Sequence, residues 1–311
     1  MRPMLHGCCL LAGCALLWGA AILGCGGPSG QARSFQEQIA LVQKEPDPQR
    51  RALRLIRIGY QQSKLLDTAG AESTFWLATR DCRAIEDAAD RAGVWALLAE
   101  AQAALNHPEA ARRAVASAQS AADEAAAPEQ KVRALSHVGQ AQAATGQHEA
   151  AAATLQSAER MAAEIHDPLD HASAAGALAL AYHHLDQRDA RDRVLRAAIQ
   201  AAERVEDPKP RGLAQAELAA RQAKMNEKDA AAETFSVALR SIEAIPSPYF
   251  RAYAMSELAQ RMADAGWPTR ARQTLDRAER TAEKIPERDL QSQALQKIRS
   301  MMNKLPRGDD P

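Results

Sequence analysis

Histidine and carboxylate side chains are the residues of this chain best suited to holding a metal ion, and they gather at residues 183–189. His183 and His184 are adjacent, and Asp186 and Asp189 follow them. On a helix, adjacent side chains point about 100° apart, whereas helical metal sites use ligands three or four residues apart. The sequence therefore predicts no metal site and no cofactor. A metal- or small-ligand-binding role for the His183/His184 region is kept as an alternative hypothesis.

The sequence contains none of the common catalytic motifs. It has no glycine-rich phosphate loop, no G-x-S-x-G and no H-E-x-x-H. Its 39 basic and 39 acidic residues balance and are interleaved, whereas a nucleic-acid-binding protein has a basic stripe. We therefore expect a protein that is not an enzyme, has no catalytic residues and does not bind nucleic acid.

The first 24 residues are typical of a secretory signal. Arg2 precedes an uncharged run from Met4 to Gly24, and Cys25 follows directly. This order resembles a bacterial lipoprotein signal, which implies that residues 1–24 are removed, that Cys25 is lipidated and that residues 25–32 form a flexible linker.

Two alternatives remain open for this segment. The run Leu11-Ala12-Gly13-Cys14 fits the lipoprotein box more closely, but cleavage before Cys14 would leave apolar residues 15–23 on the mature chain. The uncharged run is also long enough to stay as a transmembrane anchor.

Export determines where the protein is expected and which thiol is free. The lipoprotein resemblance implies a membrane-anchored protein of the cell envelope. Gly26 lacks the aspartate of an inner-membrane retention signal, so in an envelope with two membranes we expect the periplasmic side of the outer membrane. Cys82 is then the only free thiol, and its position on the small-residue face of a predicted helix indicates a buried, unreactive side chain.

A 40-residue repeat positions all of these residues. Five turn positions hold residues that tolerate the left-handed conformation: Asn106, Gly146, Asp186, Asn226 and Gly266. Leu66 departs from this series, and we expect Asp67 and Gly70 to form that turn instead. Nine residues after each turn comes a large apolar residue: Phe75, Val115, Leu155, Leu195, Phe235 and Leu275. This spacing predicts helical hairpins, each of which buries one face against its neighbours.

The starts of the hairpins are marked by an N-cap residue followed by proline. The pairs are Asp47-Pro48, Asp167-Pro168, Asp207-Pro208 and Ser247-Pro248. The register predicts a lone helix at 33–45, six hairpins over 48–287, a closing helix at 289–304 and a disordered tail at 306–311. The expected fold is all-α, a right-handed α-solenoid of antiparallel hairpins with about 13 helices.

Specific residues give the hairpin a family resemblance. Its first helix has Trp95, Leu98 and Ala99, and its second has Ala111, Val115 and Ala118. This pattern resembles the tetratricopeptide repeat, over residues 33–305. The family repeat has 34 residues, so the second helix here is longer by more than a turn, and the family's superhelical pitch does not carry over.

The resemblance implies a groove lined by the first helices in which a protein or peptide partner binds. The matching positions are Leu53, Ile56, Tyr60, Lys64, His183, His184, Lys224 and Tyr253. The family's Lys/Asn clamp for a peptide carboxylate is absent, because its asparagine positions hold Tyr60, Glu100, Gln140, Leu180, Ala220 and Gln260. We expect a partner helix or extended segment rather than a free peptide C-terminus.

A basic residue stands one turn into the first helix of every hairpin. These residues are Arg51, Arg91, Lys131, His171, Arg211 and Arg251. They are expected to pair with the end of the preceding second helix and its acids, and the alternative is a basic stripe for an anionic polymer or lipid. Acids such as Glu159 and Glu279 are expected to be solvated or paired at i,i+4.

The sequence therefore predicts an exported, lipid-anchored scaffold for protein–protein interaction in the bacterial cell envelope. A purely structural spacer is a further alternative.

Overall fold

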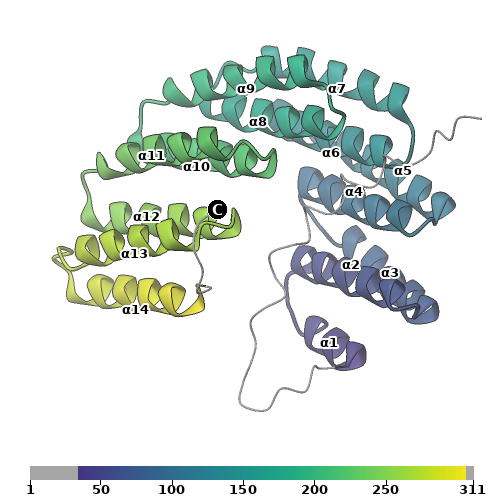
Figure 1. The fold of residues 1–311 in the computed structure, drawn as a ribbon, viewed down its shortest axis with the longest axis horizontal. Helices are drawn as coiled ribbons and strands as arrows, with labels where there is room; N and C mark the ends of the chain where they lie inside the picture. The colour runs from purple at the N-terminus through teal and green to yellow at the C-terminus, as the bar shows by residue number, and fades with distance from the viewer. Residues whose placement is uncertain (1–33, 306–311) are drawn as a thin grey trace, which may run out of the picture. The chain divides into compact units, whose positions relative to one another are not determined.

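The computed structural model describes residues 34–305, so the predicted signal, Cys25, the linker and the tail lie outside the described residues. Within them the chain is all-α, with 14 helices, the number that the lone helix, six hairpins and closing helix of the predicted register give. Consecutive helices pack as hairpins, and neighbouring first helices also touch (Figure 1). The helices are α1 (Phe35–Val42), α2 (Pro48–Lys64), α3 (Thr68–Arg83), α4 (Ala88–Ala104), α5 (Pro108–Glu124), α6 (Pro128–Ala144), α7 (His148–Ala163), α8 (Pro168–His184), α9 (Arg188–Glu203), α10 (Pro208–Lys224), α11 (Lys228–Glu243), α12 (Pro248–Asp264), α13 (Pro268–Ala282) and α14 (Arg288–Lys304).

The helices form two compact units. The N-terminal unit, residues 34–204, contains α1 to α9, and the C-terminal unit, residues 205–305, contains α10 to α14. In the N-terminal unit, α1 packs on α2, and the hairpins α2–α3, α4–α5, α6–α7 and α8–α9 follow. In the C-terminal unit, the hairpins α10–α11 and α12–α13 are followed by α14, which packs on α12 and α13. The even-numbered helices α2 to α12 are the first helices of the hairpins, and the odd-numbered helices α3 to α13 are the second.

Every hairpin turn has a residue in the left-handed region. The backbone φ is 80° at Gly146 and 64° at Leu66. After the turn residue, the next amide donates back to the first helix, as the Gln147 N–H does to the Gln142 carbonyl at 2.8 Å. The predicted turn series is confirmed, but the expectation for the first turn is wrong, because Leu66 itself adopts the left-handed conformation.

Aspartate side chains cap the starts of several helices. Asp167 accepts from the N–H groups of Leu169 and Asp170, both at 2.9 Å, and Asp47 accepts from the Gln49 N–H at 2.9 Å. Ser247 makes no such side-chain bond within the described structure. The predicted N-caps are therefore confirmed for the aspartates but not for the serine.

The two helices of a hairpin approach each other where a small residue faces a large apolar one. A Cβ atom on Gly139 would lie 2.5 Å from Leu155 Cδ2, and one on Gly59 would lie 2.9 Å from Phe75 Cε1. Both large side chains are buried. The corresponding positions on the other first helices hold Ala99, Ala179, Ala219 and Ala259. The distance between the helices thus depends on a small residue at this position.

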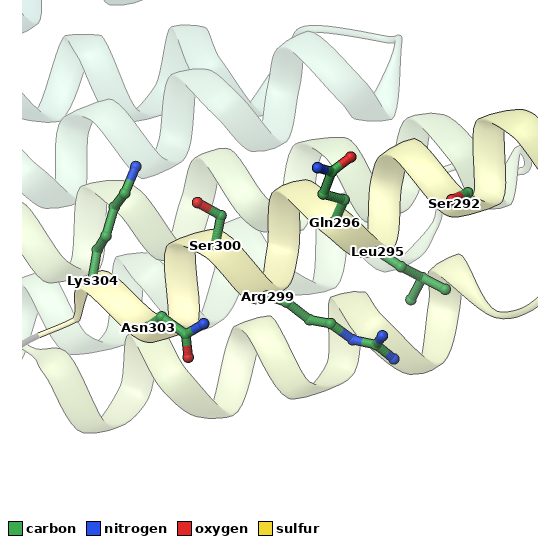
Figure 2. A pocket seen from close by; sticks show the side chains of 7 residues that line it. All are labelled: Ser292, Leu295, Gln296, Arg299, Ser300, Asn303 and Lys304. Carbon is green, nitrogen blue, oxygen red and sulfur yellow. The ribbon is translucent and has the colours of Figure 1, made fainter.

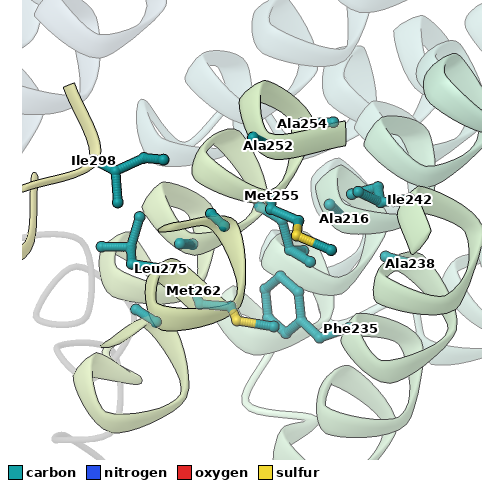
Figure 3. Packing of buried hydrophobic residues seen from close by; sticks show 14 of the residues in the cluster. Ala216, Phe235, Ala238, Ile242, Ala252, Ala254, Met255, Met262, Leu275 and Ile298 are labelled. Atoms are coloured by element: carbon teal, nitrogen blue, oxygen red, sulfur yellow. The ribbon is translucent and has the colours of Figure 1, made fainter. Parts of the chain in front are cut away.

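The core of the C-terminal unit shows how these contacts extend from one hairpin to the next. Phe235 of α11 lies beside Met262 of α12 (Figure 3), and its ring is 5.2 Å from that of Trp267 in an edge-to-face arrangement. Ile298 of α14 belongs to the same buried cluster. Each hairpin therefore buries its apolar face only together with its neighbours.

Four arginines of the basic series bind the loop before their own helix. Arg91 Nη1 donates to the carbonyls of Ile85 at 2.7 Å and Glu86 at 3.1 Å. Arg51, Arg211 and Arg251 bind the equivalent pairs of carbonyls.

The acids that pair with these arginines come from an unexpected place. Arg91 pairs with Glu124, and Arg51 lies 3.1 Å from Asp81. Both acids lie at the end of the second helix of the same hairpin, not of the preceding one as predicted. The contacts support a structural role for the arginines, because they satisfy carbonyls of the loop between consecutive hairpins.

Replacing Arg91 by methionine tests this role. We expect the Arg91→Met variant to lose about 1–3 kcal/mol of unfolding free energy, because two loop carbonyls lose a charged donor. Arg113, an exposed arginine on α5, provides the matched control, and Arg113→Met should change little. Urea denaturation followed by circular dichroism measures both, and equal losses in the two variants would contradict the proposed role.

Candidate partner-binding site

Seven of the eight predicted groove residues, all but Ile56, are at least partly exposed. They lie on one side of the first helices, which we term the first-helix face. Six of the eight, Leu53 to His184, belong to the N-terminal unit, and Lys224 and Tyr253 belong to the C-terminal unit. The face is therefore described separately for each unit.

On α2, three of the four predicted residues are accessible. Leu53 and Lys64 are exposed and Tyr60 is partly exposed. The Lys64 ammonium lies 5.4 Å from the centre of the Tyr60 ring, within the range of a cation–π contact. Ile56 is only 3% exposed, so its assignment to the groove is wrong. It faces the core, as the helical period places it next to buried Leu55 and Ala52.

His183 and His184 end α8 on the same unit. His184 is exposed and His183 is partly buried, with their rings 5.8 Å apart in an edge-to-face arrangement. Across residues 34–305, no three His, Cys, Asp or Glu side chains come close enough to hold a metal ion. The geometry therefore adds no support to the metal-binding alternative.

In the C-terminal unit, both predicted residues are exposed. Lys224 ends α10. Tyr253 on α12 has its ring covered by Lys297 of α14, whose Nζ atom is 3.8 Å from the ring centre. The aromatic face of Tyr253 is thus already occupied by a cation of the same unit.

Glu100 on α4 is the functional candidate that was not identified from the sequence. It occupies the repeat position of Tyr60, Gln140 and Leu180 on the neighbouring first helices. The carboxyl is half-buried and, among the described residues, has neither a hydrogen-bond nor an ion-pair partner. Burial raises the pKa of Glu100 to about 7. The sequence feature that could have identified Glu100 is an acid at a position where the adjacent repeats have uncharged residues.

Other half-buried acids are paired between helices. Glu159 accepts from the Tyr182 hydroxyl at 2.7 Å and from Arg193 at 2.7 Å, and Glu279 accepts from Arg299 at 2.7 Å. These acids were expected to be solvated or paired at i,i+4, and this expectation is wrong, since each is partly buried and its partners lie on other helices.

Glu217 shows what pairing does to a buried acid. Burial opposes its ionisation, but Arg221 and Arg261 outweigh that effect and lower the pKa of Glu217. Glu100 differs from these acids because no cation compensates its burial.

Cys82 is buried, as predicted. Burial, assisted by the neighbouring Asp81, raises the pKa of the thiol to about 12. A nucleophilic or metal-binding role needs the thiolate, so Cys82 serves as a small core residue.

A hollow of about 630 Å³ runs along α14 and is lined by side chains of that helix alone, including Leu295, Gln296 and Arg299 (Figure 2). Arg299 occupies the position at which Ala259 and Ala219 let a second helix approach. Within residues 34–305 no helix follows α14, so the hollow is the outward side of the last helix. Its mixed polar lining brings together no group of catalytic residues.

No helix within residues 34–305 combines the length and the apolar character needed to cross a membrane.

Together these features define an all-helical repeat protein built from hairpins of about 40 residues. No protein-family model matches the chain, and no curated protein is similar to it. Among solved structures it is similar to Ton1535 from Thermococcus onnurineus NA1, with 14% identity and a TM-score of 0.30 over 86% of this chain and 84% of that one. A likeness at this level does not assign the chain to a family.

The Glu100 carboxyl predicts a pH dependence of stability. Its pKa rises from 4.5 in the unfolded chain to about 7 in the folded one, so the folded state binds more protons between these values and stability falls as the pH rises through this range. Glu100→Gln removes this loss, and we expect it to raise the unfolding free energy at pH 8 by about 1–3 kcal/mol.

At pH 4.5, Glu100→Gln should raise the unfolding free energy much less, because the wild-type carboxyl is then protonated in the folded state. Urea denaturation at both pH values measures the difference. Glu109→Gln, on the exposed surface of α5, is the matched control and should show no such pH dependence. An equal gain for Glu100→Gln at both pH values would contradict the assignment.

Proposed function

We propose that the protein is an exported, lipid-anchored, tetratricopeptide-like scaffold that binds a protein segment on the first-helix face of its N-terminal unit. The observation that carries this proposal is Glu100, a half-buried carboxyl without a partner among the described residues. An unpaired buried acid lowers stability. Pairing with a group of another molecule would offset this loss of stability and would explain why an acid stands at this position.

The buried pattern of the hairpins supports the tetratricopeptide-like assignment. Trp95, Leu98 and Ala99 of α4 are buried, as are Ala111, Val115 and Ala118 of α5. These are the positions at which the family signature has its packing residues.

The surroundings of Glu100 define the chemistry of the proposed partner. Ala103 and Ala104, next along the same helix, are small and partly or fully exposed, so they leave space for another chain. A lysine or arginine of a partner segment would pair with the Glu100 carboxylate in a site partly shielded from water, where charged hydrogen bonds are strong. Binding of such a cation would also release the proton from Glu100.

The membrane anchor is proposed from the sequence, because Cys25 lies outside the described residues. Residues 1–24 would be removed on export and Cys25 lipidated, which places the scaffold in the cell envelope. The proposed protein is not an enzyme and needs no cofactor. No observation on residues 34–305 favours the metal-binding alternative at His183 and His184.

Site-specific photo-cross-linking in intact cells tests the proposal. A photoreactive residue at Tyr60, on the first-helix face, should give a discrete cross-linked product with a second protein. The same residue at Ser120, exposed on the second helix α5, is the control and should give none. Glu100→Gln should weaken the Tyr60 product, because the charged contact is lost.

Fractionation of the same cells tests the anchor. Cys25→Ser should release the chain from the membrane or stop its processing, whereas Cys14→Ser should have no effect. If mass spectrometry shows that the wild-type chain keeps residues 1–24 and carries no lipid on Cys25, it is held by an uncleaved transmembrane segment. No cross-linked product from Tyr60 or from Leu53 would contradict the scaffold proposal and favour a structural spacer.

A further inference from the structure

The outward surface of α3 differs from that of every other second helix. Six residues three or four positions apart form one continuous row on it, which we term the α3 outer stripe. They are Leu66, Ala69, Ser73, Trp76, Arg80 and Arg83, and all six are exposed. Leu66 precedes the helix and the other five lie on it.

Trp76 is the most unusual member of the stripe. Its side chain is 66% exposed, although tryptophan ordinarily buries most of its large apolar surface. The equivalent positions on the other second helices hold small, polar or charged residues: Ala116, Gln156, Arg196, Ser236 and Asp276. The repeat therefore does not require an aromatic residue here.

Leu66 is unusual in both its exposure and its backbone conformation. It is 87% exposed, and its φ of 64° is a conformation that a leucine adopts only at an energetic cost. The other five turns place Asn, Asp or Gly at this position. A residue that is unfavourable for both solvation and backbone conformation points to a role outside the fold.

The charge of the stripe is also distinctive. Its six positions hold two arginines and no acid, and exposed Glu72 lies beside them, four residues before Trp76. The equivalent six positions of every other second helix include at least one acid: Glu109 and Asp123, Glu149, Asp186 with Asp189 and Glu203, Asp229 with Glu233 and Glu243, or Asp276 with Glu283. Asp81 lies beside the stripe but is buried and bound to Arg51 and Arg80. Arg80 keeps a side chain that is about half exposed, and Arg83 is exposed as well.

We propose that the α3 outer stripe lies against an anionic lipid surface, with Leu66 and Trp76 inserted at the interface and Arg80 and Arg83 bound to lipid phosphates. Apolar residues combined with arginine on one helix surface are typical of interfacial membrane binding. This inference rests on the proposed lipid anchor at Cys25.

The position of the stripe along the chain agrees with a nearby membrane. Only eight residues separate Cys25 from Ser34, the first described residue, and the connection spans at most about 30 Å when fully extended. Ser34 caps α1, which packs on α2, and α2 forms a hairpin with α3. A lipid at Cys25 would therefore keep this hairpin within reach of the bilayer.

Quenching of tryptophan fluorescence by brominated lipids tests the inference. The full chain is reconstituted into brominated phosphatidylcholine vesicles with or without brominated phosphatidylglycerol, and the emission of Trp76 is taken as the difference between wild type and Trp76→Gln. We expect loss of most of the Trp76 emission in the anionic vesicles and little loss in the zwitterionic ones. Arg80→Ser with Arg83→Ser should restore the emission.

Gln156→Trp, made in the Trp76→Gln background, is the matched control. It places a tryptophan at the equivalent position of α7, and its emission should stay unquenched. Leu66→Asn introduces the residue of two other turns and should weaken quenching without loss of helical circular dichroism, so a folding defect is not the cause.

Flotation of the same vesicles separates this inference from the proposed anchor. If the chain does not float with the vesicles, the anchor proposal fails. If it floats while Trp76 is quenched by acrylamide from the water and not by bromolipid, only the lipid-docking inference is overturned. Equal quenching in both vesicle types, or protection of Trp76 only by an added protein, would also overturn it.

Discussion

The close approach of the two helices within each hairpin is the constraint on which the rest of the structure depends. Gly139 and Gly59 touch Leu155 and Phe75 so closely that a Cβ atom would overlap the facing side chain. Since each hairpin then buries its remaining apolar surface only against its neighbours, one small residue per repeat controls how the surfaces of a unit are arranged. The left-handed turns and the arginine–carbonyl bonds keep this approach in register.

Most of the fold could be predicted from the sequence because it repeats. The turn at Gly146 and the buried position of Leu155 follow from local rules that apply in each hairpin, and repetition removes the ambiguity of a single match. Leu66 was mispredicted because residue preference favours Asn or Gly in that conformation, whereas the geometry of the hairpin forces it on whichever residue is present. Ile56 was misplaced because a family position says nothing about local burial.

The candidate site was harder to predict because it depends on pairing between helices. Sequence spacing shows contacts along one helix, such as i,i+4 pairs, but not the bond from Tyr182 to Glu159 between α8 and α7. For the same reason the sequence did not identify Glu100, whose distinctive property is the lack of a partner among the described residues. Both proposed surfaces lie where one repeat departs from the others, Glu100 on a first helix and Trp76 on a second.

A double-mutant cycle between Gly139 and Leu155 tests the central constraint most directly. In the wild-type background, Gly139→Ala should lower the free energy of unfolding by about 1–3 kcal/mol, because the alanine Cβ atom would overlap Leu155. In the Leu155→Ala background, which lacks the Cγ and Cδ atoms that the new Cβ would meet, the same change should be neutral or stabilising, because alanine favours the helix over glycine by about 0.5–1 kcal/mol. Additive effects in urea denaturation would show that these residues do not set the distance between the helices, and would contradict the packing on which both proposed surfaces depend.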